Sequence, residues 1–430
     1  MKTKIRLLFI FIYSFILLYQ PDFSPWIKLN NFILCGIFTA IYLLINISYK
    51  DKNIIKSLKK KPFLIFIIMQ IAATVYFALR TIVAGTSITD ILGLRIVQGL
   101  IPIMYLIGAL IVNNELNQLG YDRKQKYNFI ISLALCQGLI ALLMYFVPSI
   151  KVISKTIFMN GWVTEINTLY ILQNRLHGLC DGDYTYGLQI MHSILALFAI
   201  AYAVSYKDKK AFIKAIIIFM VTLLNGRFGI IVFAIGFLFL LIDYIINSKN
   251  LVNAIKIITI TLIIGISMVF FLKNFMPNTY SLVREAFLDV NRYTDGTSGN
   301  TETSHWLSMF IWPAGLSIII GCGHRVLGEK GLPYGFTKSS DVGYVNDMFM
   351  GGIVYMFLLY YGYYYIVRNI LKKIDKKCFE RKAVLIVTLG MLLANLKGEA
   401  LRSAILTSSF IFIITILLIS TNYELDEKKK

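Results

Sequence analysis

The sequence is poor in charge, cysteine and histidine. Only 15% of its 430 residues are charged, whereas 57% are hydrophobic, and the mean hydropathy is +0.69. Soluble domains carry about a quarter charged residues, so this composition excludes an ordinary soluble protein. The five cysteines have no paired-ligand spacing, which argues against a zinc or iron–sulfur site. A disulfide between Cys180 and Cys322 stays open, because spacing alone does not establish proximity.

Several motifs of catalysis and energy coupling are missing as well. The chain has no P-loop, no dinucleotide-binding fingerprint and no Gly-x-Ser-x-Gly elbow. The missing P-loop argues against an ATP-driven pump. None of the four histidines forms a His-x-x-x-His pair, so no metal site is implied. We therefore expect neither a metal nor another cofactor.

What the sequence does have is a succession of apolar segments of membrane-spanning length. We predict an all-α polytopic membrane protein with about twelve transmembrane helices, forming a single integral membrane domain over residues 1–430. The basic N-terminus and the apolar run after it lack a small-residue cleavage site, so this run is assigned as the first helix. The predicted spans are 5–19, 31–47, 62–79, 91–112, 129–147, 186–206, 212–224, 228–246, 255–272, 348–367, 383–396 and 401–418.

The distribution of basic residues predicts the topology. Most of the 43 Lys and Arg residues fall at the two ends of the chain and in alternate connections between spans. The positive-inside rule then predicts that both termini are cytoplasmic. It also predicts a large extracytoplasmic loop at 273–347 and a second one at 149–185. The cytoplasmic connections account for the formal net charge of +20, which therefore does not indicate nucleic-acid binding.

Arginines stand out on the predicted outer side, because the lysines are largely inside. A guanidinium pairs with phosphate oxygens in a bidentate manner and keeps its charge, so several arginines at one outward cavity would suit a diphosphate. Arg95 is unusual because a charge inside a span is costly. The alternative for each is an interfacial anchor or a loop ion pair, which is favoured for Arg80 and Arg402. The outer arginines are Arg80, Arg95, Arg175, Arg227, Arg325 and Arg402.

Histidines and acidic residues of the outer loops are candidates for proton transfer or substrate contact. His177, His305 and His324 all lie in predicted outer loops, whereas His192 lies on an apolar helix and is expected in the core. Asp341 is a candidate general base. Because Asp341 precedes a predicted span, an ordinary helix N-cap is its alternative role.

Three stretches carry a resemblance to a known family. The first is Asn174-Arg-Leu-His-Gly178 in the second outer loop, and the second is the tight turn Leu224-Asn-Gly-Arg-Phe-Gly229. The third is Gly321-Cys-Gly323, which is followed by Ser340-Asp-Val-Gly-Tyr344 and Gly352-Ile-Val-Tyr355. They resemble, in order, the Arg-x-x-Gly segment, the Ser-Arg-[Ser/Thr]-Gly turn and the Gly-x-Gly of the O-antigen polymerase and O-antigen ligase superfamily.

The last segment departs from the ligase pattern. Gly352 and Tyr355 keep the ligase spacing from position 341, but Asp341 replaces the ligase histidine and Val342 the polar residue after it. This departure favours a polymerase-like member over a ligase.

The resemblance implies a multi-pass, metal-independent glycosyltransferase, similar in fold class to the C-type transferases. It would transfer a growing glycan from undecaprenyl diphosphate to the acceptor sugar of a second lipid-linked repeat unit, at the outer face of the bacterial plasma (inner) membrane. Arg175 and Arg227 would stabilise the leaving diphosphate, and Asp341 or His305 would activate the acceptor hydroxyl. Further candidates for substrate contact are Arg80, Arg95, His177, His324, Arg325 and Tyr344.

The implied partners are the undecaprenyl-diphosphate-linked oligosaccharide, membrane lipid, a chain-length regulator and a flippase, with no nucleic acid. Three alternatives remain open: a polysaccharide flippase or other transporter, an O-antigen ligase-type transferase, and an assembly subunit. Transporters commonly have charged groups near the middle of the membrane, whereas the polar groups here collect in outer loops.

Overall fold

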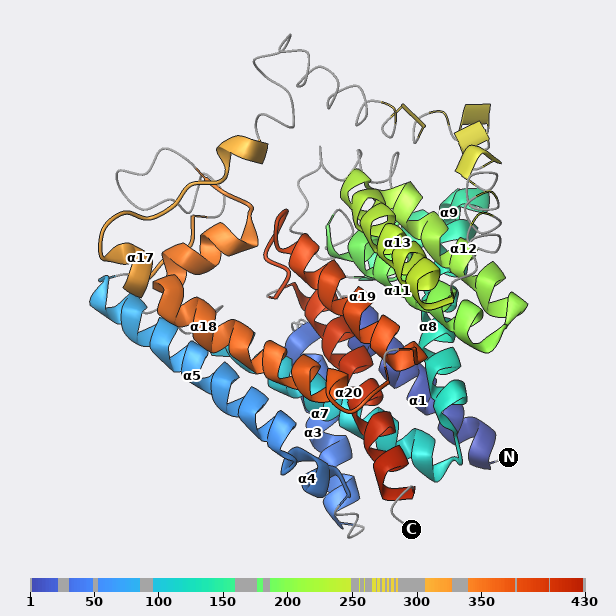
Figure 1. The fold of residues 1–430 in the computed structure, drawn as a ribbon, viewed down its shortest axis with the longest axis horizontal. Helices are drawn as coiled ribbons and strands as arrows, with labels where there is room; N and C mark the ends of the chain where they lie inside the picture. The colour runs from blue at the N-terminus through green and yellow to red at the C-terminus, as the bar shows by residue number, and fades with distance from the viewer. Residues whose placement is uncertain are drawn as a thin grey trace.

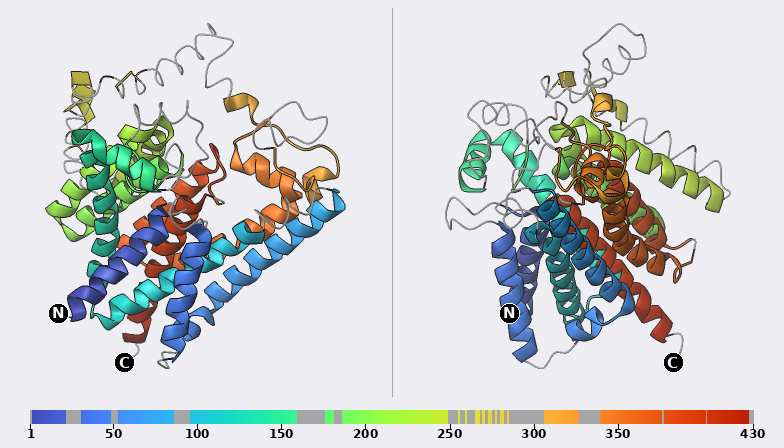
Figure 2. Two further views of the ribbon diagram at one scale, coloured as in Figure 1. Left: turned by 180° about the vertical axis from the view of Figure 1, so that it is seen from behind. Right: turned by 90° about the vertical axis from the view of Figure 1, so that its left-hand side faces the viewer.

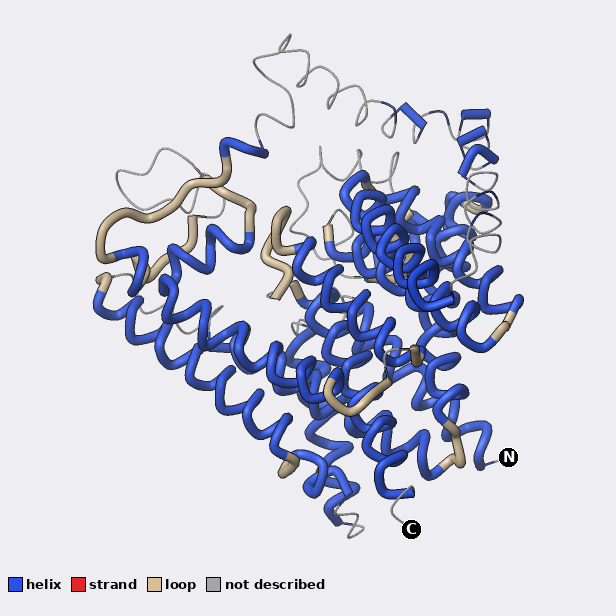
Figure 3. Tube along the Cα trace, in the orientation of Figure 1, coloured by secondary structure: helices blue, strands red, loops and turns tan. Residues whose placement is uncertain are grey.

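A computed structural model describes residues 2–21, 31–48, 53–85, 96–158, 176–180, 186–248, 306–326, 339–375, 377–401 and 403–427, with scattered residues between 255 and 284. These residues form helices joined by turns and loops, with no strand among them (Figures 1 and 3). The helices are α1 (Lys2–Tyr19), α3 (Asn31–Ser48), α4 (Asn53–Leu58), α5 (Lys61–Val83), α7 (Ile96–Gln118), α8 (Arg123–Phe146), α9 (Pro148–Phe158), α11 (Gly187–Tyr206), α12 (Lys209–Asn225), α13 (Arg227–Ser248), α17 (Ser317–Ile320), α18 (Gly343–Leu371), α19 (Phe379–Ala394) and α20 (Ala404–Glu427).

Six helices in the described part of the chain are long and apolar enough to cross a membrane. The chain is therefore a helical protein of the multi-pass membrane type, as its composition predicts. Each predicted span overlaps one of the helices, except the span at 255–272, which lies largely outside the described residues. The six ranges are Lys61–Val83, Gly99–Gln118, Arg123–Phe146, Gly187–Tyr206, Phe228–Ile246 and Gly343–Leu371.

Helix α11 lies at the centre of the bundle and α13 at its periphery. Of the apolar window of α11, 89% is buried, against 17% for α13. Helix α11 packs against α8, α12, α13, α19 and α20. Along α13, large apolar side chains such as Ile231, Leu238 and Ile242 are exposed. An exposed apolar face of this kind is expected of a helix that borders lipid.

Helices α5 and α18 run side by side along the other flank and are joined to the centre by α7 and α20 (Figures 1 and 2). The start of α1 and the end of α20 lie at the same end of the bundle (Figure 2). The short connection between α19 and α20 lies at the opposite end, between α18 and the group of α11 and α13 (Figure 3).

Capping residues extend the helices beyond their apolar spans at the end that carries the termini. Asp122 accepts a hydrogen bond from Gln125 N at 2.7 Å, and the Gln125 side chain accepts one from Asp122 N, which completes a capping box at the start of α8. Asp208 caps α12 in a similar way through Lys210 N and Ala211 N. The polar ends of these helices are thus specified by local hydrogen bonds, which hydropathy does not detect.

Candidate functional site

The site is built around a break in α18. At Gly351 and Gly352 the backbone leaves the helical conformation, with φ of −159° and +63° respectively. The Phe349 carbonyl accepts hydrogen bonds from Cys322 N at 2.6 Å and Gly323 N at 3.1 Å. A kinked helix must satisfy its freed carbonyls elsewhere, and here the loop after α17 supplies the donors.

Glycines allow this loop to approach α18 closely. A Cβ on Gly321, which has φ of +75°, would lie 2.3 Å from Gly351 Cα. A Cβ on Gly352 would lie 2.4 Å from the carbonyl carbon of Ile319. The family-like segment Gly321–Gly323 is therefore in backbone contact with Gly351, the residue just before the family-like segment Gly352–Tyr355, and no larger residue fits at the contact.

The end of α5 holds the same loop from its other side. Arg80 donates from Nε to Ile320 O at 2.9 Å and from Nη2 to Gly321 O at 2.8 Å. Thr81 Oγ1 donates to Gly323 O at 3.0 Å, and Tyr76 Oη donates to Ile320 O at 3.1 Å. Two sides of the Arg80 guanidinium are thus bound to backbone. This geometry favours a positioning role for Arg80 over contact with a substrate.

The chain on either side of the 327–338 segment is held together by a buried asparagine. Val326 O accepts from Ser340 N at 2.7 Å, and Asn346 Oδ1 accepts from Val326 N at 3.0 Å. Asn346 Nδ2 donates to Ser340 O at 2.8 Å. These bonds fix the segments that carry Arg325 and Asp341, which are the residues next to Val326 and Ser340.

Asp341 does not cap α18. The helix begins at Gly343, its N-cap residue is Val342, and no side chain caps it. Instead, Val342 N donates to Ser340 Oγ at 3.2 Å. The capping role that the sequence leaves open for Asp341 is therefore wrong. Its side chain is half-buried at the end of the fixed segment.

Arg325 forms a loop ion pair, the alternative role expected of an outer arginine, but its partner was not predicted. Its Nη1 lies 2.8 Å from Glu399 Oε2, with the two side chains 19% and 11% exposed. Arg325 and Tyr355 line the same small cavity of about 20 Å³, which α5, α7 and α18 enclose together with Leu401. That volume holds about one water molecule, so this cavity does not itself admit a sugar. Glu399 is a functional candidate that spacing alone missed.

The connection between α19 and α20 joins these groups to the start of α18. Asn395 O accepts from Gly343 N at 3.0 Å, and Asn395 Oδ1 accepts from Ala400 N at 3.0 Å. Buried Asp347 accepts from Tyr360 Oη at 2.6 Å and from Asn395 Nδ2 at 3.4 Å. Asp347 and Asn395 are further residues that sequence reasoning missed.

Two aromatic side chains beside this connection, those of the candidate Tyr344 and of Trp306, have protein partners. Tyr344 Oη donates to Leu392 O at 3.0 Å, and its ring stacks on Tyr360 with centroids 6.0 Å apart. Trp306 Nε1 donates to Leu396 O at 3.0 Å. These contacts hold the rings in fixed orientations at the edge of the site.

The family-like segments Asn174–Gly178 and Leu224–Gly229 also contact each other. Asn225 Nδ2 donates to Leu176 O at 2.8 Å, which joins the turn before Arg227 to the residue after Arg175. On the turn itself, Gly229 N donates to Gln189 Oε1 at 3.0 Å. A Cβ on Gly226 would lie 2.2 Å from the Gln189 side chain, so the turn packs closely against α11.

The described part of the Arg-x-x-Gly segment rests on α8 and α9. Gln137 Nε2 donates to His177 O at 3.1 Å, and Ser154 Oγ donates to Gly178 O at 3.1 Å. His177 is fully buried, and its Nδ1 lies 2.8 Å from Gly178 O. These contacts favour a structural role for His177. In α9, burial lowers the pKa of Lys151 to about 8.

Tyr186, at the start of α11, connects α11 to the α19–α20 connection. Its hydroxyl donates to Ala394 O at 2.7 Å. A Cβ on Gly398 would lie 2.5 Å from the Tyr186 ring, so this ring packs on the α19–α20 connection. The α19–α20 connection therefore contacts both the start of α18 and α11, the helix that carries Gln189.

The remaining candidates are placed in part or not at all. Arg227 is the first residue of α13, but its side chain lies outside the described residues, as do Arg95, Arg175, His305 and Arg402. His324 is half-buried, with its ring centroid 6.1 Å from that of Phe349. His192 is buried in α11, as expected. Cys180 and Cys322 do not form a disulfide.

Within the described residues, no group of three or more His, Cys, Asp or Glu side chains could hold a metal ion. Comparison with protein-family models and with curated proteins finds no match to this chain. A functional assignment therefore depends on the site itself and on the short segments that meet there.

Proposed function

We propose that this protein is a membrane-embedded glycosyltransferase that polymerises lipid-linked oligosaccharide repeat units. The observation that supports it most is the pairing of the family-like segments. Leu176 contacts Asn225 in the turn before Arg227, and Gly321–Gly323 contact Phe349 and Gly351, just before the segment that begins at Gly352. Segments that resemble one family and lie far apart in the sequence are expected to meet if they form a common site.

The proposed topology has about twelve transmembrane helices, with both termini in the cytoplasm of a bacterium and the site facing outward from its inner membrane. The start of α1 and the end of α20 lie at one end of the bundle, which agrees with termini on one side (Figure 2). The site lies at the other end, beside the α19–α20 connection (Figure 3).

In the proposed reaction, an acceptor hydroxyl attacks the anomeric carbon of the donor glycan. The bond from that carbon to the diphosphate oxygen breaks, and the undecaprenyl diphosphate leaves with the electron pair. Asp341 accepts the proton of the acceptor hydroxyl as a general base. Arg175 and Arg227 stabilise the negative charge that grows on the diphosphate.

Arg325 and Glu399 have a supporting role in this scheme. Their ion pair fixes the segment that leads to Asp341 against the α19–α20 connection. Because Glu399 neutralises Arg325, this arginine is a weaker candidate for the diphosphate than Arg227. His305 remains the alternative general base, and Arg95 and His324 remain proposed substrate contacts.

The test is a turnover assay in proteoliposomes with a lipid-diphosphate-linked repeat unit and no nucleotide sugar. We expect a ladder of longer products from the wild type and none from Arg227→Ala or Asp341→Asn. Arg284→Ala is the matched control, because Arg284 is an exposed arginine of the same predicted outer side. Movement of the lipid-linked unit across the bilayer without extension would instead indicate a flippase. Transfer to a different acceptor without extension would indicate a ligase-type enzyme.

A further inference from the structure

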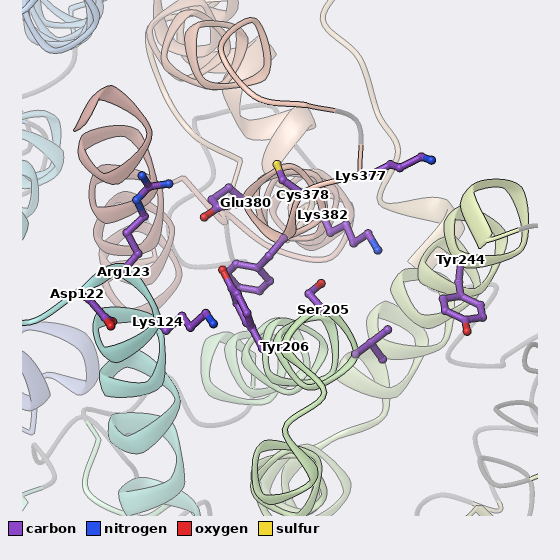
Figure 4. Close-up of a pocket in the computed structure, with 12 residues that line it drawn as sticks. Asp122, Arg123, Lys124, Ser205, Tyr206, Tyr244, Lys377, Cys378, Glu380 and Lys382 are labelled. Atoms are coloured by element: carbon purple, nitrogen blue, oxygen red, sulfur yellow. The ribbon is translucent and has the colours of Figure 1, made fainter. Parts of the chain in front are cut away.

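A large cavity lies at the opposite end of α11, α18 and α19 from the candidate site. It has a volume of about 720 Å³ and lies between the starts of α8 and α19 and the ends of α11 and α13 (Figure 4). The connections around it are those in which the basic residues of the chain concentrate. Nothing in the proposed transfer reaction uses this cavity.

The cavity has more positive than negative charge available to a ligand. Four basic residues line it against two carboxylates, which both have hydrogen-bond partners. One of the four, Lys382, forms an ion pair with Asp243 at 3.5 Å. Asp122 caps α8, and Glu380 accepts a hydrogen bond from Tyr127 Oη at 2.9 Å. The basic residues are Arg123, Lys124, Lys377 and Lys382.

One of the ammonium groups, that of Lys124, lies over an aromatic ring of the cavity. Lys124 Nζ lies 4.9 Å from the centroid of the Tyr206 ring. Cys378, the N-cap residue of α19, makes no capping hydrogen bond. Burial raises the pKa of the Cys378 thiol to about 11, so it contributes no negative charge at neutral pH. The start of α19, whose first turn also carries Glu380, thus lies at the cavity.

A shallow apolar groove continues from this cavity, and it encloses only about 30 Å³ of free space, so an acyl chain would lie over its open side. Val204, Tyr244 and Lys382 line both the cavity and a second hollow between α11 and α13. The other lining residues of the second hollow are all apolar: Ile200, Ala201, Phe237, Leu240 and Leu241. Because α13 is mostly exposed and apolar, this groove opens toward the region where lipid chains would lie.

We propose that this cavity binds the headgroup of an anionic membrane phospholipid, with one acyl chain along the groove between α11 and α13. The phosphodiester oxygens would accept charge-assisted hydrogen bonds from Lys124, Lys377 and Arg123. Basic pockets between transmembrane helices are suited to such headgroups. A zwitterionic lipid lacks the net charge that this arrangement favours. The proposal does not depend on the transferase reaction.

The test measures thermal unfolding of the purified full-length protein in a neutral detergent. Short-chain phosphatidylglycerol, short-chain phosphatidylcholine and glycerol phosphate are titrated separately. A ligand that binds the folded state raises the unfolding temperature as its concentration increases. We expect phosphatidylglycerol to raise it in a saturable manner, and phosphatidylcholine to have little effect.

The variant Lys124→Gln/Lys377→Gln should weaken the apparent affinity for phosphatidylglycerol by roughly tenfold or more. Lys209→Gln/Lys210→Gln is the matched control, because it removes two exposed charges from the neighbouring connection but none from the cavity. If the double variant does not fold, Lys377→Gln alone is used, because Lys377 is exposed and its replacement should not prevent folding. It should likewise weaken the apparent affinity for phosphatidylglycerol. Equal effects in both double variants would overturn the proposal.

The glycerol phosphate titration separates a lipid site from a general phosphate site. We expect it to bind more weakly than phosphatidylglycerol, because it cannot fill the apolar groove. Leu241→Trp, at a half-buried residue that lines the groove but not the cavity, should weaken phosphatidylglycerol binding and leave glycerol phosphate binding unchanged. Equal affinity for the two ligands would overturn the lipid assignment.

Discussion

Gly321 packs directly against the backbone of Gly351, so that a Cβ on Gly321 would lie 2.3 Å from Gly351 Cα. One glycine follows α17, and the other begins the break in α18. The contact lets Cys322 N and Gly323 N reach the freed carbonyl of Phe349. The family-like Gly-x-Gly segment therefore allows close backbone packing against α18. The effect of its glycines on stability can be tested separately from the proposed chemistry.

Gly321→Ala should destabilise the protein strongly. The new Cβ meets the Gly351 backbone, and φ of +75° is unfavourable for alanine. We expect a loss of about 3 kcal/mol or more, seen as a lowered unfolding temperature in detergent. Gly315→Ala is the control, because Gly315 has a similar φ of +59° but no atom within 4 Å of its Cβ position. It should cost about 1 kcal/mol. Equal losses would show that the close approach is unimportant.

The variant Arg80→Lys should not retain the stability of the wild-type protein. The guanidinium reaches two successive carbonyls, Ile320 O and Gly321 O, from Nε and Nη2, which a lysine ammonium cannot reproduce. We expect Arg80→Lys and Arg80→Gln to lower the stability by a similar amount, about 2 kcal/mol, in thermal unfolding. If lysine restored full stability, the positive charge and not the shape of the guanidinium would be the important feature.

The positions of the apolar helices could be predicted from the sequence, because hydropathy alone determines them. The prediction at 186–206 corresponds to α11 (Gly187–Tyr206). The start of α18 could not be predicted in this way. The predicted span begins at 348, whereas the helix begins at Gly343, because its polar first turn is held by Asn395 and not by lipid.

The pairings within the site could not be predicted either. Arg325 and Glu399 are opposite charges in different connections, and many other pairings satisfy the same charge pattern. Two charged residues in the short connection between the last two predicted spans, Lys397 and Glu399, were the available signal. The Asn225–Leu176 contact likewise depends on how α12 packs, which no spacing rule describes.

Lys151→Met should stabilise the protein at neutral pH. Burial lowers the pKa of Lys151 to about 8. Below that pH the folded protein carries a buried ammonium group, which lowers its stability. Between pH 8 and the ordinary lysine pKa of 10.5, the unfolded chain binds the proton that the folded chain has lost, and wild-type stability rises with pH. We expect a gain of at most about 3 kcal/mol at pH 7 that shrinks above pH 8 and disappears by about pH 10.5. A gain independent of pH would contradict this cause.

Single cysteines should report the proposed topology in a background without native cysteine. Leu316→Cys is placed at a residue that is 66% exposed near α17, and Lys209→Cys at an exposed residue at the start of α12. A membrane-impermeant maleimide added to intact spheroplasts should label the first and not the second. Permeabilised cells, in which both label, are the control for reactivity. Labelling of only Lys209→Cys in intact cells would invert the topology and exclude an outward-facing site.

The ion pair of Arg325 and Glu399 should show strong energetic coupling. The two groups lie 2.8 Å apart and are mostly buried, so removing either one leaves the other charge without its partner. We expect Arg325→Gln and Glu399→Gln each to cost about 3 kcal/mol in thermal unfolding, and the double variant to cost clearly less than their sum. A coupling energy of about 1 kcal/mol or more would support the pair as the link between the Asp341 segment and the α19–α20 connection. Strictly additive effects would mean that the two residues act separately, and Glu399 would then lose its place in the site.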